Sequence, residues 1–323
     1  MKVAINAIEY YLPSKTEDGS NLKEQNPDWR IDDIQAKTGI NIRRISAPNE
    51  TAADMAVLAA EKLLYSKVDI EDVDFLVFVT QSPDYLLPTS ACILQDRLGL
   101  KKSCMAFDVN LGCSGFVYGL AIGGALIEAG IARSGLLICS DTYTKYIDQD
   151  DRTCRPLFSD GAAAAYLTSS TYETLGPFEM GTDGSGFNNL IVPSGGARSF
   201  ELNERKLSMA GSNVFMFTMD MVPKCVDALL AKAKLNIDEI DLFVFHQASK
   251  LVIDNIIRRL ELPEEKVFTN YQDIGNTVSA SIPIALSDVE NAKRLNNGDQ
   301  VMLVGFGVGY SWGGCIVHWN SGA

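Results

Sequence analysis

Short, continuous hydrophobic segments alternate along the chain with longer segments of helical periodicity. Residues 75–79 and 242–245 are the clearest of these, because each is apolar throughout and follows an acidic turn. Strands that are apolar on both faces are typical of parallel-rich sheets covered by helices on both sides. Residues 1–8 indicate a first strand and lack the long apolar run and cleavage site of a signal peptide. The pattern predicts an α/β fold.

The pattern also repeats within the chain. Residues 68–82 align without a gap to residues 235–249, and each segment is an acidic turn that leads into a buried strand. Two further pairs follow at nearly the same offset, residues 111–114 with 274–277 and residues 135–140 with 300–305. Chance similarity between generic strands is the alternative, and three matches in order disfavour it. The sequence therefore predicts two halves, 1–170 and 171–323, whose sheets alternate with helical layers in a five-layer αβαβα arrangement.

Residues 111–132 are apolar enough to resemble a membrane span, with Glu128 as their only charge. Gly115, Gly119 and Gly123 recur at every fourth position, which leaves one helix face almost without side chains. Such a face permits a close crossing with another element inside a protein core. We therefore expect a buried central helix and no membrane partner.

Composition narrows the function classes. The 323 residues are 46% hydrophobic and 21% charged, as in ordinary globular proteins, and the net charge of −13 gives no general case for nucleic-acid binding. No phosphate-binding loop occurs. The seven cysteines are odd in number and scattered, with no C-x-x-C pair, which argues against structural disulfides and zinc. We expect a cytoplasmic protein without a metal ion or other cofactor.

Cys113 lies where a hydrophobic strand end runs into a glycine-flanked turn and then the apolar helix. Unpaired N–H groups at a helix start favour a thiolate and an oxyanion formed beside it. Cys113 is therefore a candidate nucleophile. The alternative is that it is one more buried thiol, since free cysteine packs as a small hydrophobe.

His246 and Asn276 are the candidate partners of Cys113. The internal repeat puts Asn276 at the turn equivalent to that of Cys113, and His246 ends the strand 242–245, where α/β proteins place ligands. The other histidine, His318, lies in a terminal strand and suits packing or a surface position.

These residue types fit one chemistry well. A cysteine thiolate can carry an acyl group as a thioester, while histidine and asparagine can donate hydrogen bonds to an enolate formed as CO2 leaves. A glutamate in place of the asparagine would suit proton abstraction, and a second cysteine would suit thiolysis. A glycine-rich turn at 305–309 can bring backbone N–H groups to a substrate oxyanion, although a plain β-turn is as good an interpretation.

At these motifs the chain resembles the beta-ketoacyl-acyl-carrier-protein synthase III family, initiating condensing enzymes with a thiolase-like fold. The resemblance covers nearly the whole chain and rests on residues 37–40, 47–51, 107–108, 112–116, 158–161, 209–211, 246–248, 275–277 and 311–313. It implies that Cys113 is the acyl acceptor and that His246 and Asn276 are the decarboxylation pair. The backbone N–H groups of Cys113 and Val308 would form the oxyanion hole. It also implies a homodimer, an acyl-CoA starter and malonyl-acyl-carrier protein as substrates.

The resemblance further implies the binding residues. Those for the substrate are Lys37, Arg152, Gly211, Ser249 and Phe306, and the acyl pocket also takes Tyr143, Phe158, Leu207 and Leu87 of the partner subunit. The chain departs from the family at several positions. Asp33 stands where a tryptophan often contacts the CoA adenine, and Val308 and Ser249 replace the usual glycine and asparagine. Tyr143 is bulkier than the usual aliphatic residue, so the starter acyl group could be unusual.

An acidic protein needs local cations to dock an acyl carrier protein. Lys250, Arg258 and Arg259 lie on a predicted helix over 249–260, with Lys250 and Arg258 near one face. An ordinary solvated helix surface is an equally good interpretation.

The leading hypothesis is decarboxylative condensation of an acyl group on Cys113 with malonyl-acyl-carrier protein, which gives a 3-oxoacyl-acyl-carrier protein. A close alternative is acyl transfer to an oxygen or nitrogen nucleophile in a specialised pathway. A non-catalytic partner subunit should lack the nucleophile, and a thiol hydrolase should have an orienting acid beside His246, which the sequence does not offer.

Overall fold

Two β-sheets form the frame of the protein. The computed structural model describes residues 1–201 and 204–320. The first sheet has the strand order β1-β7-β6-β4-β5. Its strands are β1 (Val3–Tyr11), β4 (Phe75–Val79), β5 (Met105–Val109), β6 (Ser134–Asp141) and β7 (Gly161–Ser169). Strand β4 runs parallel to β5 and β6, whereas β7 is antiparallel to β6 and β1. The edge strand β5 therefore pairs on one side, with β4.

The second sheet repeats this topology in the order β11-β12-β13-β8. Its strands are β8 (Leu175–Thr182), β11 (Leu242–Phe245), β12 (Gln300–Gly307) and β13 (Ser311–His318). Strand β11 is parallel to β12, and β13 is antiparallel to β12 and β8. An isolated parallel bridge between Phe243 and Val267 takes the place that β5 has in the first sheet. The internal repeat is thus present in the fold.

Both sheets are mixed, so the expectation of parallel-rich sheets is wrong. Of the strand pairings described, two of four in the first sheet and two of three in the second are antiparallel. The short turn between β12 and β13 spans residues 308–310, and such a turn can join only antiparallel strands. The glycines of the sequence indicate a turn there, but a strand that is apolar throughout does not indicate whether its neighbours run parallel or antiparallel to it.

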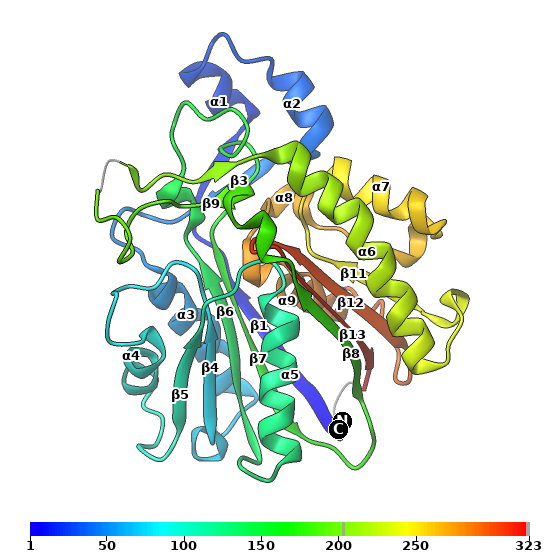
Figure 1. Cartoon of the computed structure of the whole chain (residues 1–323). Helices are drawn as coiled ribbons and strands as arrows, with labels where there is room; N and C mark the ends of the chain where they lie inside the picture. The colour runs from blue at the N-terminus through cyan, green and yellow to red at the C-terminus, as the bar shows by residue number, and fades with distance from the viewer. Residues whose placement is uncertain (202–203, 321–323) are drawn as a thin grey trace.

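Helices cover both faces of each sheet, which gives the predicted five layers (Figure 1). The outer layer on the first sheet is α3 and α4, the middle layer is α5 and α9, and the outer layer on the second sheet is α6 and α7. Their bounds are α3 (Ala52–Ser66), α4 (Ser90–Arg97), α5 (Gly115–Glu128), α6 (Gly211–Ala233), α7 (Lys250–Leu260) and α9 (Ser281–Asn291).

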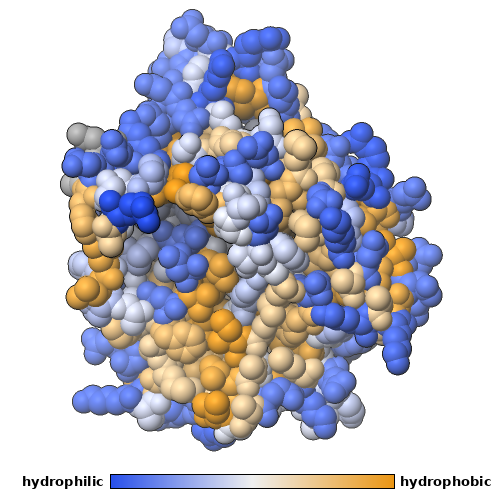
Figure 2. All heavy atoms as spheres, viewed as in Figure 1, coloured by the Kyte–Doolittle hydropathy of each residue, from blue (hydrophilic) through white to orange (hydrophobic). Residues whose placement is uncertain are grey.

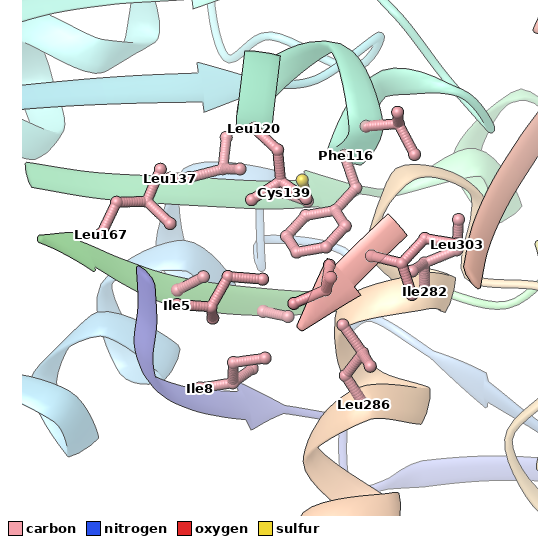
Figure 3. Packing of buried hydrophobic residues seen from close by; sticks show 14 of the residues in the cluster. Ile5, Ile8, Phe116, Leu120, Leu137, Cys139, Leu167, Ile282, Leu286 and Leu303 are labelled. Atoms are coloured by element: carbon pink, nitrogen blue, oxygen red, sulfur yellow. The ribbon is translucent and has the colours of Figure 1, made fainter. Parts of the chain in front are cut away.

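The core between the sheets is built by alternating strand side chains. In β11, Leu242 and Val244 face the middle layer, while Phe243 and Phe245 face the outer helices. Residues of both sheets meet α5 and α9 in this central core (Figure 3). Figure 3 labels its members Ile5, Ile8, Phe116, Leu120, Leu137, Cys139, Leu167, Ile282, Leu286 and Leu303. Because this core joins the halves, it fixes the starts of α5 and α9 relative to each other.

The glycine face of α5 lies against the first sheet. A Cβ atom added to Gly119 would stand 2.3 Å from Leu137 Cδ1 on β6, so the helix backbone approaches the strand closely. The predicted buried central helix is confirmed, with a sheet as its partner. Within the described residues, no helix has the length and hydrophobicity to span a membrane.

Smaller elements lie at the end of the sheets where the site forms. Strands β2 (Lys15–Asp18) and β3 (Ile42–Ile45) pair and carry α1 (Gly19–Gln25) and α2 (Ile31–Thr38). Strands β9 (Leu190–Ile191) and β10 (Ser208–Met209) form a second short pair, and α8 (Tyr271–Ile274) precedes α9.

Candidate active site

One cavity brings the three candidate catalytic residues together. Its volume is about 590 Å3, and its lining includes Cys113, His246 and Asn276. Cys113 lies between β5 and α5, His246 directly follows β11, and Asn276 follows α8. A larger hollow of about 1100 Å3 lies over α1 and α2, but its lining is mostly polar or charged and holds none of these residues. We therefore centre the candidate site on the smaller cavity.

Cys113 is a buried thiol at the cavity wall, with 5% of its surface exposed. Burial raises its pKa to about 12, and the charge of Asp141 adds to this effect. The sequence led us to expect that the helix start would favour a thiolate. That expectation is wrong for the resting protein, because the loss of hydration outweighs the nearby N–H groups. The sulfur is therefore protonated at rest.

Two backbone N–H groups donate toward the Cys113 sulfur, that of Val308 and that of Cys113 itself, and both lower the pKa of the thiol. The turn comes this close because residue 307 is glycine. A Cβ atom there would stand 2.8 Å from Sγ, and its φ of 158° is one that other residues rarely adopt. The two donors form a concave backbone site beside the sulfur, suited to an oxyanion.

His246 is neutral and held in one orientation. Its Nδ1 lies 2.6 Å from Ser281 Oγ, and its ring meets Phe306 edge to face with centroids 5.6 Å apart. Burial lowers the pKa of His246 to about 3. Ser281 Oγ accepts the Gln247 N–H at 3.4 Å, which leaves the hydroxyl hydrogen for Nδ1 and favours the tautomer with a proton on Nε2. His246 can then donate a hydrogen bond without carrying charge.

Asn276 is oriented by its own turn. Its Oδ1 accepts the Val278 N–H at 3.0 Å, and its backbone exchanges hydrogen bonds with Leu157 and Ser159. With Oδ1 occupied, the side-chain NH2 group is the part left to donate into the cavity. Val278 has a φ of 55°, a strained conformation for a β-branched residue that costs roughly 1–3 kcal/mol. The fold tolerates this strain at the turn that presents the amide.

Asp141 links the two halves beside the site, and sequence inspection did not identify it. This fully buried carboxylate accepts the Gln81 N–H at 2.8 Å and the Ser279 hydroxyl at 2.5 Å. Burial raises its pKa to about 7. Because Ser279 lies between Asn276 and Ser281, Asp141 fixes the segment that positions both donors. Its only sequence signal was its place at the end of a buried strand.

The predicted substrate-binding residues other than Arg152 divide into three groups. Those that line the cavity with Cys113 are Lys37, Phe158, Gly211, Ser249 and Phe306. Tyr143 and Leu207 belong to a buried cluster that also contains Cys113, but neither is among the described residues that line the cavity. Leu87 lies outside the cavity of its own chain and is 82% exposed.

A second pocket of about 500 Å3 adjoins the cavity. It contains Arg152 and Trp29, and it shares Lys37, Thr38 and Thr153 with the cavity. Asp33 also lines it and forms an ion pair with Arg30 at 2.6 Å. Trp29, four residues before Asp33, is an aromatic side chain of this pocket. Sequence analysis did not identify it.

The predicted docking cations are on the surface of α7. Lys250 forms an ion pair with Asp254 one turn along the helix, and Arg258 donates to Asn255 Oδ1 at 2.7 Å. Arg258 and Arg259 are exposed in the last turn. All three cations thus belong to α7, the helix that the cavity-lining Ser249 caps. Among residues 1–201 and 204–320, no cluster of three or more histidine, cysteine, aspartate or glutamate side chains could hold a metal ion.

Comparisons with known proteins agree on one family. The model for 3-oxoacyl-[acyl-carrier-protein] synthase III matches residues 107–184, and the model for its C-terminal part matches residues 230–319. The chain is 37% identical over 329 residues to beta-ketoacyl-[acyl-carrier-protein] synthase III of Clostridioides difficile, with 99% of each chain covered.

Solved structures give the same picture. A crystal structure of a 3-oxoacyl-(acyl-carrier-protein) synthase III superposes with a TM-score of 0.96 at 43% identity, covering 99% of this chain and 100% of that one. The priming beta-ketosynthase of the R1128 polyketide pathway gives a TM-score of 0.91 at 30% identity, covering 99% and 97%. The similarity therefore extends over both halves of the fold.

Proposed function

Because the chain belongs to the 3-oxoacyl-[acyl-carrier-protein] synthase III family, we propose that it is an acyl-transferring condensing enzyme. It joins an acyl group from acyl-CoA to the two-carbon unit of malonyl-acyl-carrier protein and thereby initiates fatty acid or related synthesis. The observation that carries this proposal is the shared cavity, where a thiol meets two uncharged hydrogen-bond donors.

The first step is acylation of Cys113. The sulfur attacks the thioester carbonyl of the acyl-CoA, and the N–H groups of Cys113 and Val308 stabilise the oxyanion that forms. CoA leaves as its thiolate and takes up the proton that the Cys113 thiol loses. Since the resting thiol is protonated, proton loss contributes to the barrier of this step.

The second step is decarboxylation and carbon–carbon bond formation. The thioester oxygen of the malonyl group accepts hydrogen bonds from His246 Nε2 and the Asn276 amide, so negative charge can gather on it as CO2 leaves. The resulting enolate attacks the acyl-Cys113 carbonyl, and collapse of that intermediate frees the Cys113 sulfur. The product is a 3-oxoacyl thioester on the carrier protein. This chemistry needs no cofactor.

Both substrates can reach the cavity through the adjoining pocket. Trp29 and Arg152 offer a ring and a guanidinium to the CoA nucleotide, and Lys37 lies on the path between them and Cys113. Cations on α7 (Lys250, Arg258 and Arg259) suit the acidic surface of a carrier protein. The net charge of −13 makes such local cations necessary.

We also propose that the enzyme is a homodimer. Strand β5 is an edge strand made mostly of apolar residues that are only partly buried, and such an edge favours pairing. Hydrophobic atoms gather on the face that carries β5 and α5 (Figure 2). Tyr85, Leu86 and Leu87 are 61%, 72% and 82% exposed in a neighbouring loop. A second copy would cover this surface and bring Leu87 of the partner subunit toward the acyl group. The free thiols of the seven cysteines suit a cytoplasmic location.

Intact-protein mass spectrometry with carbon dioxide counting tests the function. Incubation with acyl-CoA should add one acyl mass to Cys113, and addition of malonyl-acyl-carrier protein should discharge it with one CO2 released per turnover. An adduct that persists in Cys113→Ala would contradict the assignment. Discharge to an oxygen or nitrogen nucleophile without CO2 would favour the alternative acyltransferase.

A further inference from the structure

The start of α5 lies against the end of β12 and the turn that follows it. Helix α5 contacts both β12 and β13, and the backbones approach closely because residue 305 is glycine. A Cβ atom on Gly305 would stand 2.6 Å from the Cys113 carbonyl oxygen and 2.7 Å from Ser114 Cα. The turn at residues 308–310 and the segment that carries the nucleophile are therefore neighbours in one packed region.

Ser311 holds the turn at residue 308. Its hydroxyl donates to the Val308 carbonyl oxygen at 2.8 Å. The Val308 N–H donates toward the Cys113 sulfur, so residue 308 is held on both sides, by its carbonyl group and by its N–H group. Because Ser311 is only 2% exposed, water competes little for its hydrogen bond.

Ser114 connects Ser311 to the helix that follows the nucleophile. Its Oγ lies 2.7 Å from Ser311 Oγ, and both serines are buried. Ser311 gives its one hydroxyl hydrogen to Val308, so Ser114 is the donor in this pair. A serine at the N-cap of a helix usually accepts a backbone N–H of the first turn, but among the described residues Ser114 makes no such bond. Its hydroxyl serves the neighbouring turn instead of its own helix.

We propose that Ser311 and Ser114 are positioning residues for acyl transfer, whose hydroxyls hold the turn so that the Val308 N–H stays directed at the oxyanion formed beside Cys113. The proposal rests on the function proposed above. A donor stabilises a transition state when it is already fixed where the charge develops, and a displacement of about 1 Å can cost about a hundredfold in rate. The Val308 donor is a backbone group, so its alignment depends on the side chains that hold the turn.

The test measures the rate constant for acylation of Cys113 by saturating acetyl-CoA, followed by single-turnover mass spectrometry. Ser311→Ala removes the bond to Val308 and should lower this rate constant by about thirtyfold, because a loosened donor loses much of what an oxyanion donor supplies. The acetyl-CoA concentration that gives half the maximal rate should stay within about threefold, since the donor acts in the transition state. Ser311→Thr keeps the hydroxyl and should recover most of the loss.

Two further variants test the chain of hydrogen bonds. Ser114→Ala keeps the bond from Ser311 to Val308 and removes only its support, so it should lower the acylation rate constant by about threefold. Because both serines act through one chain, the double variant should lose no more than Ser311→Ala alone. Ser134→Ala is the matched control. It also removes a buried hydroxyl that donates to a backbone carbonyl, that of Asp72, but at the start of β6, and it should leave the rate constant unchanged.

Decarboxylation separates positioning of the donor from general damage to the fold. It depends on His246 and Asn276, so Ser311→Ala combined with Cys113→Ala should release CO2 from malonyl-acyl-carrier protein within about threefold of Cys113→Ala alone. Unchanged acylation in Ser311→Ala, an equal loss of acylation and decarboxylation, or the same loss of acylation in Ser134→Ala would each contradict the positioning role while the acyl-enzyme stands. If no acyl-CoA modifies wild-type Cys113, the proposed function itself is wrong, and the positioning role with it.

Discussion

The two halves of the molecule use one scaffold for different chemical tasks. In the first half, the turn after β5 leads through Cys113 into α5. In the second half, the turn after α8 leads through Asn276 into α9. Both turns open onto the same cavity, and both helices lie in the middle layer between the sheets. The scaffold fixes where the two turns meet, whereas the side chain at each turn decides which step it serves.

The halves also differ at their sheet edges. The first sheet ends in the complete strand β5, while the second has the single bridge at Val267 in the same place. Here the chain of the second half goes on to build α8 and the turn that orients Asn276. Strand β5 therefore has an edge without a partner strand among the described residues, whereas the equivalent region of the second half carries the turn that presents Asn276.

The largest effect should come from removing the nucleophile in the first half. Cys113→Ala should abolish the acyl adduct and lower condensation by at least about a thousandfold, because no thioester can form. Decarboxylation of malonyl-acyl-carrier protein should persist within about tenfold, since its donors lie in the second half. Adduct mass and CO2 release measure the two separately. Equal loss of both activities would show that the halves do not act independently.

A smaller effect is expected from the second half. Asn276→Asp should lower condensation by about a hundredfold, because a carboxylate cannot donate to the developing enolate. Acylation of Cys113 should stay within about threefold of wild type. Single-turnover acylation and steady-state product formation measure the two steps. Impaired acylation would instead place Asn276 in the first step.

Ser281 sharpens the comparison further. Ser281→Ala removes the hydroxyl that lies against His246 Nδ1 and should lower condensation by about tenfold with little change in acylation. Ser281→Thr should restore most of the loss because it keeps the hydroxyl. Nitrogen NMR of the His246 ring should report the Nε2-protonated tautomer in the wild type and a mixture in Ser281→Ala. An unchanged tautomer would mean that Ser281 serves packing alone.

The smallest effect should be that of pH on the second half. The pKa of His246 is lowered to about 3, so the ring stays neutral, and condensation by pre-acylated enzyme should vary less than about threefold between pH 8 and pH 9, above the raised pKa of Asp141. The first half provides the contrast. With the pKa of Cys113 raised to about 12, its alkylation by iodoacetamide should rise about tenfold per pH unit to at least pH 10. A plateau below pH 9 would contradict the buried thiol.

The sequence predicts the five-layer fold better than it predicts the buried residues that hold the site residues in position. Apolar strands and the repeat predict the five layers, because burial on both faces leaves a continuous hydrophobic signal. The same repeat pairs Cys113 with Asn276. Ser281 and Asp141 carry no such signal, since a serine and an aspartate look alike in a sequence whether they are solvated or buried against a partner far along the chain. Trp29 was not identified because nothing in the sequence shows that it shares a pocket with Lys37 and Arg152.

The backbone donor at Val308 has a consequence for how this protein would respond to mutagenesis. Its contribution to the site comes from a main-chain N–H, so replacing the valine by alanine, serine or threonine leaves the donor intact. Among the common residues, only proline deletes that group. A scan that truncates side chains one by one would pass over position 308 as silent, and a survey of residue identity would report it as variable. The group at position 308 that donates to the oxyanion therefore depends on the backbone conformation, and side-chain substitutions at that position do not test it.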